Sequence, residues 1–297
     1  MISICTTSIG SSLEVKLVLD YLRQRNEPGT YEYCLVHDDR YDHGDDHIYL
    51  TRLQDSYPEL KLGRRGILEA SFWVMQLIEF YEKNSWFTKE HRDLLKKNLF
   101  EDAAGRFLDR DKEFMWLSYG ALLNMAKEMA TGEVLLFCPH DHLMPFRLKW
   151  AEDFVKMQSK MSRFYYKPDA ILVNVTGTDS LEIGTHISQI EYHHGIHLMT
   201  KGSFEAIGGF SEEFYWRSSG DDAMSIRGQK EPSYDGRLPG LYVFQPYPDI
   251  DILGKKRKKP RYLHDGITDQ GTVIKELGSR IHSDIGAPVK FPRLSWT

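Results

Sequence analysis

The stretch from Gly132 to Pro145 limits the fold of this chain more than any other part of its 297 residues. Five consecutive apolar residues, Val134 to Cys138, lead into a polar cluster that contains His140, Asp141 and His142. A short, unbroken apolar run is typical of a strand buried on both faces of a parallel sheet. Ligands of open α/β sheets bind beyond the carboxyl ends of such strands. The stretch therefore predicts a buried strand that ends at a ligand site; the alternative is a polar strand end that holds no ligand.

The start of the chain has the pattern of a strand, a helix and a second strand. Ile2 to Thr6 predicts a strand, and apolar residues at helical spacing from Leu13 to Leu22 predict a helix. Tyr31 to Val36 predicts the second strand, which runs into Asp38 and Asp39. This order indicates a βαβ unit whose second strand has an acidic carboxyl end.

The middle of the chain is expected to be helical. The segment from Ile48 to Leu53 predicts a strand or a short helix, and apolar residues recur at helical spacing from Ile67 to Tyr81. Another helix is predicted from Tyr119 to Met129, with Gly132 as the glycine that ends it.

A second informative block runs from His197 to Asp222. A strand and a helix are predicted first, followed by Gly208 and Gly209, which allow a turn with positive φ. Gly220 then lets the chain enter a helix whose first turn carries Asp221 and Asp222. Acidic residues at that position are favoured by the helix dipole, so a purely structural role is one interpretation of this pair.

Together these segments resemble the GT-A glycosyltransferases, above all the inverting family 2. The strand after Gly132-Glu133 resembles the family's metal-binding strand, and Ser118 to Asn124 resembles the segment before it. Gly208-Gly209-Phe210 followed by Gly220-Asp221-Asp222 resembles the Gly-Gly-Phe and Gly-Glu-Asp signature, which β-1,4-galactosyltransferases share. The resemblance covers roughly residues 1–39 and 118–228.

This resemblance implies an α/β, GT-A fold: a Rossmann-like, mostly parallel sheet flanked by helices, with a smaller antiparallel element near the acceptor site. The whole chain, 1–297, would form a single catalytic domain. Residues 64–116 exceed the usual distance to the metal strand, so we expect a helical insertion there. The segment 229–297 would supply acceptor contacts and a loop that closes over the donor diphosphate.

The resemblance also implies a divalent metal on the diphosphate of a nucleotide sugar. The family uses an Asp-x-Asp pair, but Pro139 replaces its first aspartate here. The implied ligands are therefore Asp141, His142 and a late histidine, His264. A carboxylate with imidazoles suits Mn²⁺ better than Mg²⁺, which prefers oxygen ligands. The sequence leaves open whether the missing aspartate removes the dependence on metal.

The donor implied by the resemblance is a nucleotide sugar, with UDP as the expected nucleotide. Its contacts would come from the end of the first strand, the acidic pair after the second strand, the helix before the metal strand, and the metal stretch. An ordinary solvated turn is the alternative for the acidic pair, since Asp is common in turns. The expected donor-binding residues are Thr6, Thr7, Ser8, Asp38, Asp39, Asn124 and His140.

In the family, the second acid of the Glu-Asp pair is the general base. This implies that Asp222 removes the proton of the acceptor hydroxyl and that Asp221 orients the acceptor. The sugar would be attacked from the face opposite the leaving nucleoside diphosphate, with inversion of the anomeric centre. Acceptor contacts are expected from Tyr215, Trp216 and Gly209, although the two aromatic rings suit core packing equally well.

Three other functions remain as alternatives. The net charge of −5 gives no general reason to expect a polyanion, but Lys255 to Arg261 holds six cations in seven residues. Such a run suits nucleic acid, so the acceptor could be a modified base in DNA, as in phage enzymes. A sugar nucleotidyltransferase is disfavoured because no glycine-rich, lysine-containing loop follows the first strand. The missing first aspartate makes a non-catalytic nucleotide- or carbohydrate-binding relative the third alternative.

The expected insertion, 64–116, could form a contact in a homo-oligomer.

The cysteines and the apolar runs predict the cellular compartment of the protein. Cys5, Cys34 and Cys138 each lie in an apolar run, which fits buried thiols in a reducing compartment. The chain starts with a strand and has no apolar run long enough to span a bilayer, so we expect no leader or anchor and a cytoplasmic protein. Four histidines have no ligand spacing and are expected on the surface: His186, His193, His194 and His197.

Overall fold

The structure is a computed structural model, and it describes residues 1–8, 12–38, 46–83, 119–159, 163–176, 182–190, 195–213, 219–230, 232, 234–235, 241–246 and 287–293. The helices are α1 (Ser12–Arg23), α2 (Asp46–Ser56), α3 (Ile67–Lys83), α5 (Tyr119–Met129), α6 (Leu148–Gln158), α7 (Lys201–Ile207) and α8 (Ser219–Gln229). The strands are β1 (Ile2–Ser8), β2 (Tyr31–Asp38), β3 (Leu60–Arg65), β4 (Val134–Phe137), β5 (Tyr165–Tyr166), β6 (Asp169–Thr176), β7 (Glu182–Ile190), β8 (His197–Thr200), β9 (Tyr234–Asp235) and β10 (Tyr242–Pro246).

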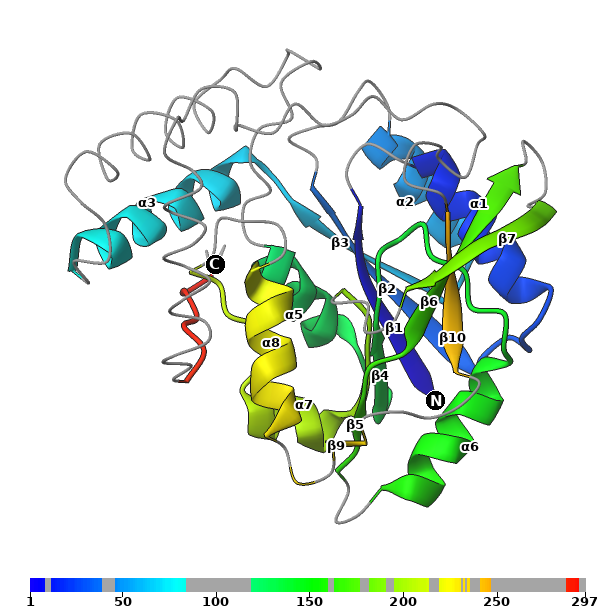
Figure 1. Cartoon of the computed structure of the whole chain (residues 1–297). Helices are drawn as coiled ribbons and strands as arrows, with labels where there is room; N and C mark the ends of the chain where they lie inside the picture. Colours follow the sequence, from blue (N-terminus) through cyan, green and yellow to red (C-terminus); the bar gives the residue numbers. More distant parts are fainter. Residues whose placement is uncertain are drawn as a thin grey trace.

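Among the described residues the main sheet has seven strands in the order β3-β2-β1-β4-β8-β5-β9. The first four strands in this order are parallel, and β8 is antiparallel to both of its neighbours. Strand β1 is central because it pairs with β2 and with β4 over its apolar residues, and all of its residues are buried. The mostly parallel α/β sheet expected from the sequence is confirmed (Figure 1).

Helices cover both faces of this sheet (Figure 1). On one face, Ile2 and Ile4 of β1 belong to a core that includes apolar residues of α1, α2 and α6. On the other face, Cys5 and its neighbour Cys34 belong to a core with α5, α7 and Met224 of α8. The period of two along a strand explains this division, since successive side chains point to opposite faces.

A smaller sheet, β10-β6-β7, packs beside the main one. Strand β6 pairs antiparallel with β7 and parallel with β10, so the small element is mixed and only partly the antiparallel one expected. Leu143, shortly after β4, exchanges two backbone hydrogen bonds with Phe244 of β10, at 2.9 and 2.8 Å. This bridge fixes the chain that leaves β4.

The structure corrects two local predictions. The sequence interpretation missed β3, which adds an edge strand and contains Arg64 and Arg65, the first residues of the expected insertion. The helix α3 is confirmed, whereas residues 84–116 of that insertion lie outside the described part. Gly132 is not a left-handed helix cap, because its φ is not positive. It is small for another reason: a Cβ would lie 2.5 Å from the Met1 carbonyl oxygen.

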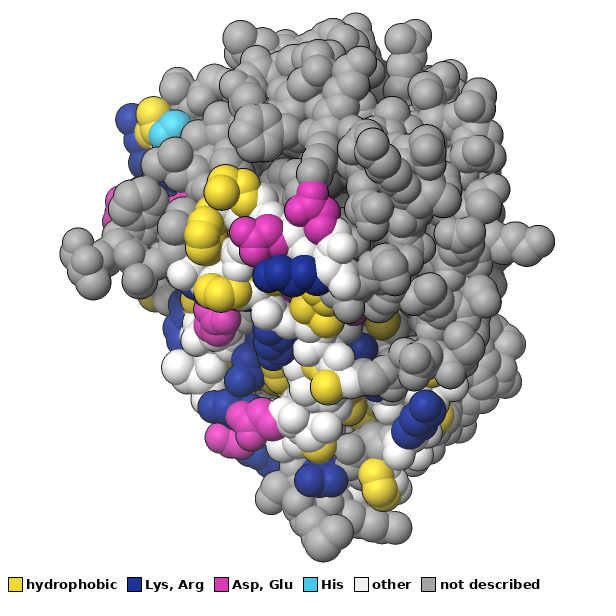
Figure 2. All heavy atoms as spheres, turned by 90° about the vertical axis from the view of Figure 1, so that its left-hand side faces the viewer, with side chains coloured by type: hydrophobic (Ala, Val, Ile, Leu, Met, Phe, Trp, Pro, Cys, Tyr) yellow, Lys and Arg dark blue, Asp and Glu magenta, His cyan; other side chains and the backbone are white. Residues whose placement is uncertain are grey.

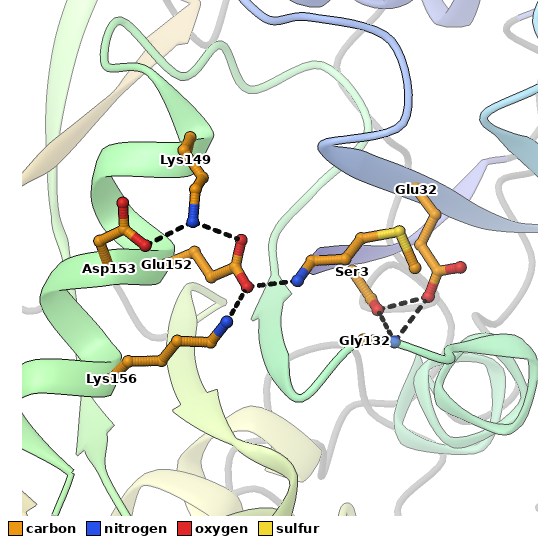
Figure 3. A network of polar contacts seen from close by, with 8 residues as sticks. Ser3, Glu32, Gly132, Lys149, Glu152, Asp153 and Lys156 are labelled. Carbon is orange, nitrogen blue, oxygen red and sulfur yellow. Dashed lines mark hydrogen bonds and ion pairs between the residues drawn. The ribbon is translucent and has the colours of Figure 1, made fainter.

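Two buried carboxylates hold the amino-terminal edge of β1 (Figure 3). Glu152 of α6 pairs with the Met1 nitrogen and with Lys156, and Glu32 of β2 accepts hydrogen bonds from Ser3 Oγ and from the Gly132 amide. Thr131 also donates to Glu32, and Lys61 pairs with it. Burial by itself would raise the pKa of Glu32, but these donors outweigh it and lower the pKa to about 2.

Glu32→Gln is therefore expected to destabilise the fold in a pH-dependent way. The folded-state pKa of Glu32 lies below its ordinary value of 4.5, so its stabilisation is present above that value and is lost as the pH falls toward 2. The difference in unfolding free energy should be on the order of 3 kcal/mol at pH 7 and should narrow below pH 4.5. Urea unfolding of both proteins at pH 7 and pH 3.5 measures it; a difference independent of pH would contradict this role.

Candidate functional site

The carboxyl ends of β1, β2 and β4 meet at one edge of the main sheet. Ser8 pairs in register with His37, and Cys5 pairs with Phe137, so the residues that follow these strands emerge together. Ser8 Oγ and His37 Nδ1 are hydrogen-bonded at 3.0 Å. Asp38 ends β2 and is fully buried. Three of the expected donor-binding segments are thus brought to one edge: Thr6–Ser8, Asp38 and the residues after β4.

The residues after β4 form a tight turn. The Cys138 amide continues the ladder to Cys5 at 3.3 Å, and the His142 amide donates to the Pro139 carbonyl at 3.2 Å. Pro139 therefore starts a turn that contains His140 and Asp141. The bridge from Leu143 to β10 closes the segment.

Asp141 and His142 lie together at the end of this turn. Asp141 Oδ1 and His142 Nδ1 are hydrogen-bonded at 2.9 Å, and both side chains are buried. Among the described residues there is no group of three His, Cys, Asp or Glu side chains placed to hold a metal. These two residues fit part of a metal site, in which a carboxylate orients an imidazole, and the remaining ligands would have to come from elsewhere. His264 lies outside the described ranges.

His140 is hydrogen-bonded to Glu14, a residue that the sequence interpretation did not include in the site. Its Nε2 is hydrogen-bonded to Glu14 Oε2 at 3.0 Å, and Tyr33 donates its hydroxyl to the His140 carbonyl at 3.4 Å. Glu14 is in the first turn of α1, directly after the loop that follows β1. The one feature of the sequence that could have indicated this contact is the acidic residue Glu14 in the first turn of the first helix.

Arg65 is a second missed residue. It pairs in register with Asp38 at the carboxyl end of β3, is 2% exposed, and its guanidinium lies 5.4 Å from the centroid of the Trp73 ring. A buried cation beside the acidic end of β2 adds positive charge to the edge where a diphosphate is expected.

The turn after α7 has the predicted geometry. Thr200 caps α7 through its side chain, which accepts from the Ser203 amide, and Gly208 and Gly209 have φ of 85° and 78°. Asn124 of α5 holds the following residues: its amide bonds the Phe210 carbonyl at 2.9 Å and Glu212 Oε1 at 2.8 Å. These contacts give Asn124 and Gly209 structural roles, and the donor and acceptor contacts expected of them stay predictions.

Helix α8 places the proposed catalytic pair in its first turn. Asp221 and Asp222 are the third and fourth residues of Ser219–Gln229, as expected from Gly220. Arg227 ties the helix to the preceding turn by donating to Ser211 Oγ at 2.9 Å and to the Gly209 carbonyl at 2.6 Å.

Several expected residues fall where the structure describes nothing. These are Asp39, Tyr215, Trp216, His264, the basic run Lys255–Arg261 and most of the segment 229–297.

One histidine prediction is wrong. His197 was expected on a loop or strand surface, but it is fully buried in β8, and its Nδ1 is hydrogen-bonded to the Tyr165 hydroxyl at 3.0 Å. Its ring also stacks on that of Tyr165. The two side chains meet because β8 pairs with β5, a pairing that ligand spacing alone does not reveal.

Glu213 is a buried acid that follows the glycine turn (Gly208–Gly209) and precedes α8 in the chain. Burial raises the pKa of the Glu213 carboxyl to about 7, against the opposing effect of Arg227. Burial also lowers the pKa of Arg227, to about 10. The turn that leads to the proposed base therefore contains a carboxyl group that titrates near neutral pH.

Glu213 should make folding stability fall as the pH rises through neutrality. Its folded-state pKa lies above its ordinary value of 4.5, so the proton stabilises the fold fully below that value and this contribution is lost as the pH rises through about 7. Glu213→Gln removes the titration. Melting temperatures from pH 5 to 8.5 should decline less steeply for the variant than for the wild type; parallel curves would contradict this assignment.

A scan against protein-family models and a search of curated protein sequences found no match. Solved structures do match. S. aureus TarS 1–349 in complex with UDP has a TM-score of 0.51 and 15% sequence identity, over 83% of this chain and 60% of that one. The same protein with UDP-GlcNAc has a TM-score of 0.51 and 12% identity, over 89% and 63%.

This chain has the GT-A fold. The fold class expected from the sequence is thus confirmed, although the chain spans only about 60% of the length of these structures. Within the described ranges, none of the helices is both long and apolar enough to cross a bilayer.

Proposed function

We propose that this chain is a nucleotide-sugar-dependent glycosyltransferase. The donor would be a UDP-sugar, the acceptor a hydroxyl group, and the product would have an inverted anomeric centre. The observation that carries the proposal is the common edge of β1, β2 and β4, which gathers Thr6–Ser8, Asp38 and His140–His142 in a GT-A fold. The fold is shared with TarS structures that contain UDP and UDP-GlcNAc.

The residues at this edge suit a nucleotide diphosphate. The hydroxyls of Thr6, Thr7 and Ser8 and the carboxylate of Asp38 are groups that hydrogen-bond a base and a ribose. Arg65 supplies positive charge close to Asp38. Polar side chains that are this deeply buried need hydrogen-bond partners, and a bound nucleotide would add to those they have.

A divalent metal fits the proposal through Asp141. The carboxylate of Asp141, the imidazoles of His142 and His264, and oxygens of the donor diphosphate would hold the ion. The metal would neutralise charge that develops on the departing diphosphate.

Catalysis is assigned to the first turn of α8. The acceptor oxygen forms a bond to the anomeric carbon while the bond from that carbon to the diphosphate oxygen breaks. UDP leaves with the bonding electron pair, and the hydroxyl proton passes to the carboxylate of Asp222. Asp221 accepts a hydrogen bond from the acceptor and orients it.

The donor site is tested by calorimetric titration of UDP and GDP, each with and without Mn²⁺. UDP should bind more tightly with Mn²⁺ than without it, and more tightly than GDP. Asp141→Ala should weaken UDP binding in Mn²⁺ by at least about tenfold, since it removes the only carboxylate of the turn. Asp153→Ala, which removes an exposed carboxylate of α6 that bonds Lys149, should bind UDP like the wild type.

Failure of UDP to bind under all of these conditions would contradict the proposed function. Tight UDP binding that is indifferent to both Mn²⁺ and Asp141 would contradict the metal site and leave the donor assignment in place.

The base is tested by release of UDP from UDP-GlcNAc, UDP-glucose and UDP-galactose, with water or simple sugars as acceptors. Asp222→Asn should lower kcat by about 10² to 10⁴, the usual contribution of a general base, and leave UDP affinity unchanged. Asp221→Asn should have a smaller effect on kcat. UDP binding by a wild type that releases no UDP from any of these donors would favour a non-catalytic relative and contradict the enzyme assignment.

A further inference from the structure

Residues 287–293, which belong to the segment 229–297 expected to supply acceptor contacts, pack against α3 and against the turn that precedes the proposed catalytic helix. They lie close to α3 and α5, near the C label of Figure 1. The Phe291 ring makes edge contacts with Trp73 and Phe80 of α3, at centroid distances of 6.1 and 6.0 Å. Gln76 of α3 donates to the Pro292 carbonyl at 3.2 Å. We call residues 287–293 the carboxyl-terminal strap.

The strap also covers Gly208 and Gly209, both of which have positive φ. A Cβ on Gly208 would lie 2.6 Å from Pro288 Cγ, and one on Gly209 would lie 2.9 Å from Lys290 Nζ. The Lys290 ammonium is 5.8 Å from the centroid of the Phe204 ring in α7. The glycine turn is therefore enclosed between α7 and the strap.

The strongest link between the strap and this turn is the ion pair of Arg293 with Glu212. The Glu212 side chain is fully buried, and Arg293 donates to both of its oxygens at 2.8 Å. Asn124 and the Phe291 amide also donate to this carboxylate, at 2.8 and 3.2 Å. In addition, the Glu212 amide donates to the Val289 carbonyl at 2.9 Å. A buried carboxylate with paired, bidentate donors has one well-defined position.

The 208–213 turn is also linked to α8. Arg227 of α8 reaches back to Gly209 and Ser211, and it stands five residues after Asp222 in the same helix. Contacts therefore run without a break from Arg293 through Glu212 and the glycine turn to Arg227. Figure 2 shows this side of the molecule, where basic and acidic side chains of the described residues lie interspersed.

We infer that Arg293 and Glu212 are positioning residues for the acceptor step: their ion pair holds the 208–213 turn so that α8 presents its first turn to the acceptor. This inference rests on the proposed function, because it assigns the base to α8. The pair does not belong to the edge formed by β1, β2 and β4. Its loss should therefore impair transfer and spare donor binding.

The test combines kinetics with hydrogen exchange on the full chain. Arg293→Met should lower kcat by about tenfold to a hundredfold, as expected for a base displaced by about 1 Å, while UDP affinity in Mn²⁺ changes less than about threefold. Amide exchange should become faster in residues 208–213 and 219–229. Arg52→Met, which changes an exposed arginine of α2, should alter neither kcat nor exchange in these segments.

A double variant separates positioning from stability. Arg293→Met alone leaves a buried carboxylate without its cation, which should lower the melting temperature. Glu212→Gln combined with Arg293→Met removes both charges and should recover the melting temperature in large part, while kcat stays low because the two-point contact is still absent. Recovery of kcat together with stability would overturn the positioning role.

Failure of the positioning role and failure of the proposed function give different results in these experiments. If the wild type binds UDP and transfers sugar but Arg293→Met does so with unchanged kcat, the inference fails and the proposed function stands. If the wild type neither binds UDP nor turns over a donor, the proposed function fails. In that case unchanged amide exchange in residues 219–229 of Arg293→Met would also overturn the link from strap to helix.

Discussion

The parallel pairing of β1 with β2 on one side and β4 on the other is the constraint on which the site depends. It brings three strand ends to one edge, where the apolar interior gives way to buried hydroxyls, carboxylates and imidazoles. The opposite end of β1 is fixed by Glu32 and Glu152. Register at one end therefore determines which residues are displayed at the other, because a slip of one residue would reverse every side chain.

The second half of the proposed machinery is held by different forces. Here the strands are short, and the position of α8 depends on side-chain contacts with a glycine turn, with Asn124 and with the strap. Donor and acceptor functions are thus assigned to two parts of the molecule that are anchored separately. Such a division fits the proposed enzyme, which would hold one substrate while it admits a second, and it underlies the inference that a contact remote from the donor edge affects the transfer step alone.

Much of the fold follows from local patterns. The apolar run Val134–Cys138, the helical spacing in α1 and α5, and the paired glycines all predicted elements that the structure has. The predictions that failed concern residues whose contacts are with partners distant in sequence. His197 is buried by Tyr165, Gly132 is small because Met1 lies against it, and β3 is a short edge strand with weak alternation. The ion pair of Arg293 with Glu212 could likewise not be predicted, since nothing in the sequence near Arg293 indicates Glu212 as its partner.

A crystal structure of the full chain with UDP and Mn²⁺ tests the central claim most directly. We predict that the uracil and ribose lie against Thr6–Ser8 and Asp38, with the diphosphate and metal at Asp141. Density for UDP at any other place, or a diphosphate remote from the turn after β4, would contradict the assignment of this edge as the donor site.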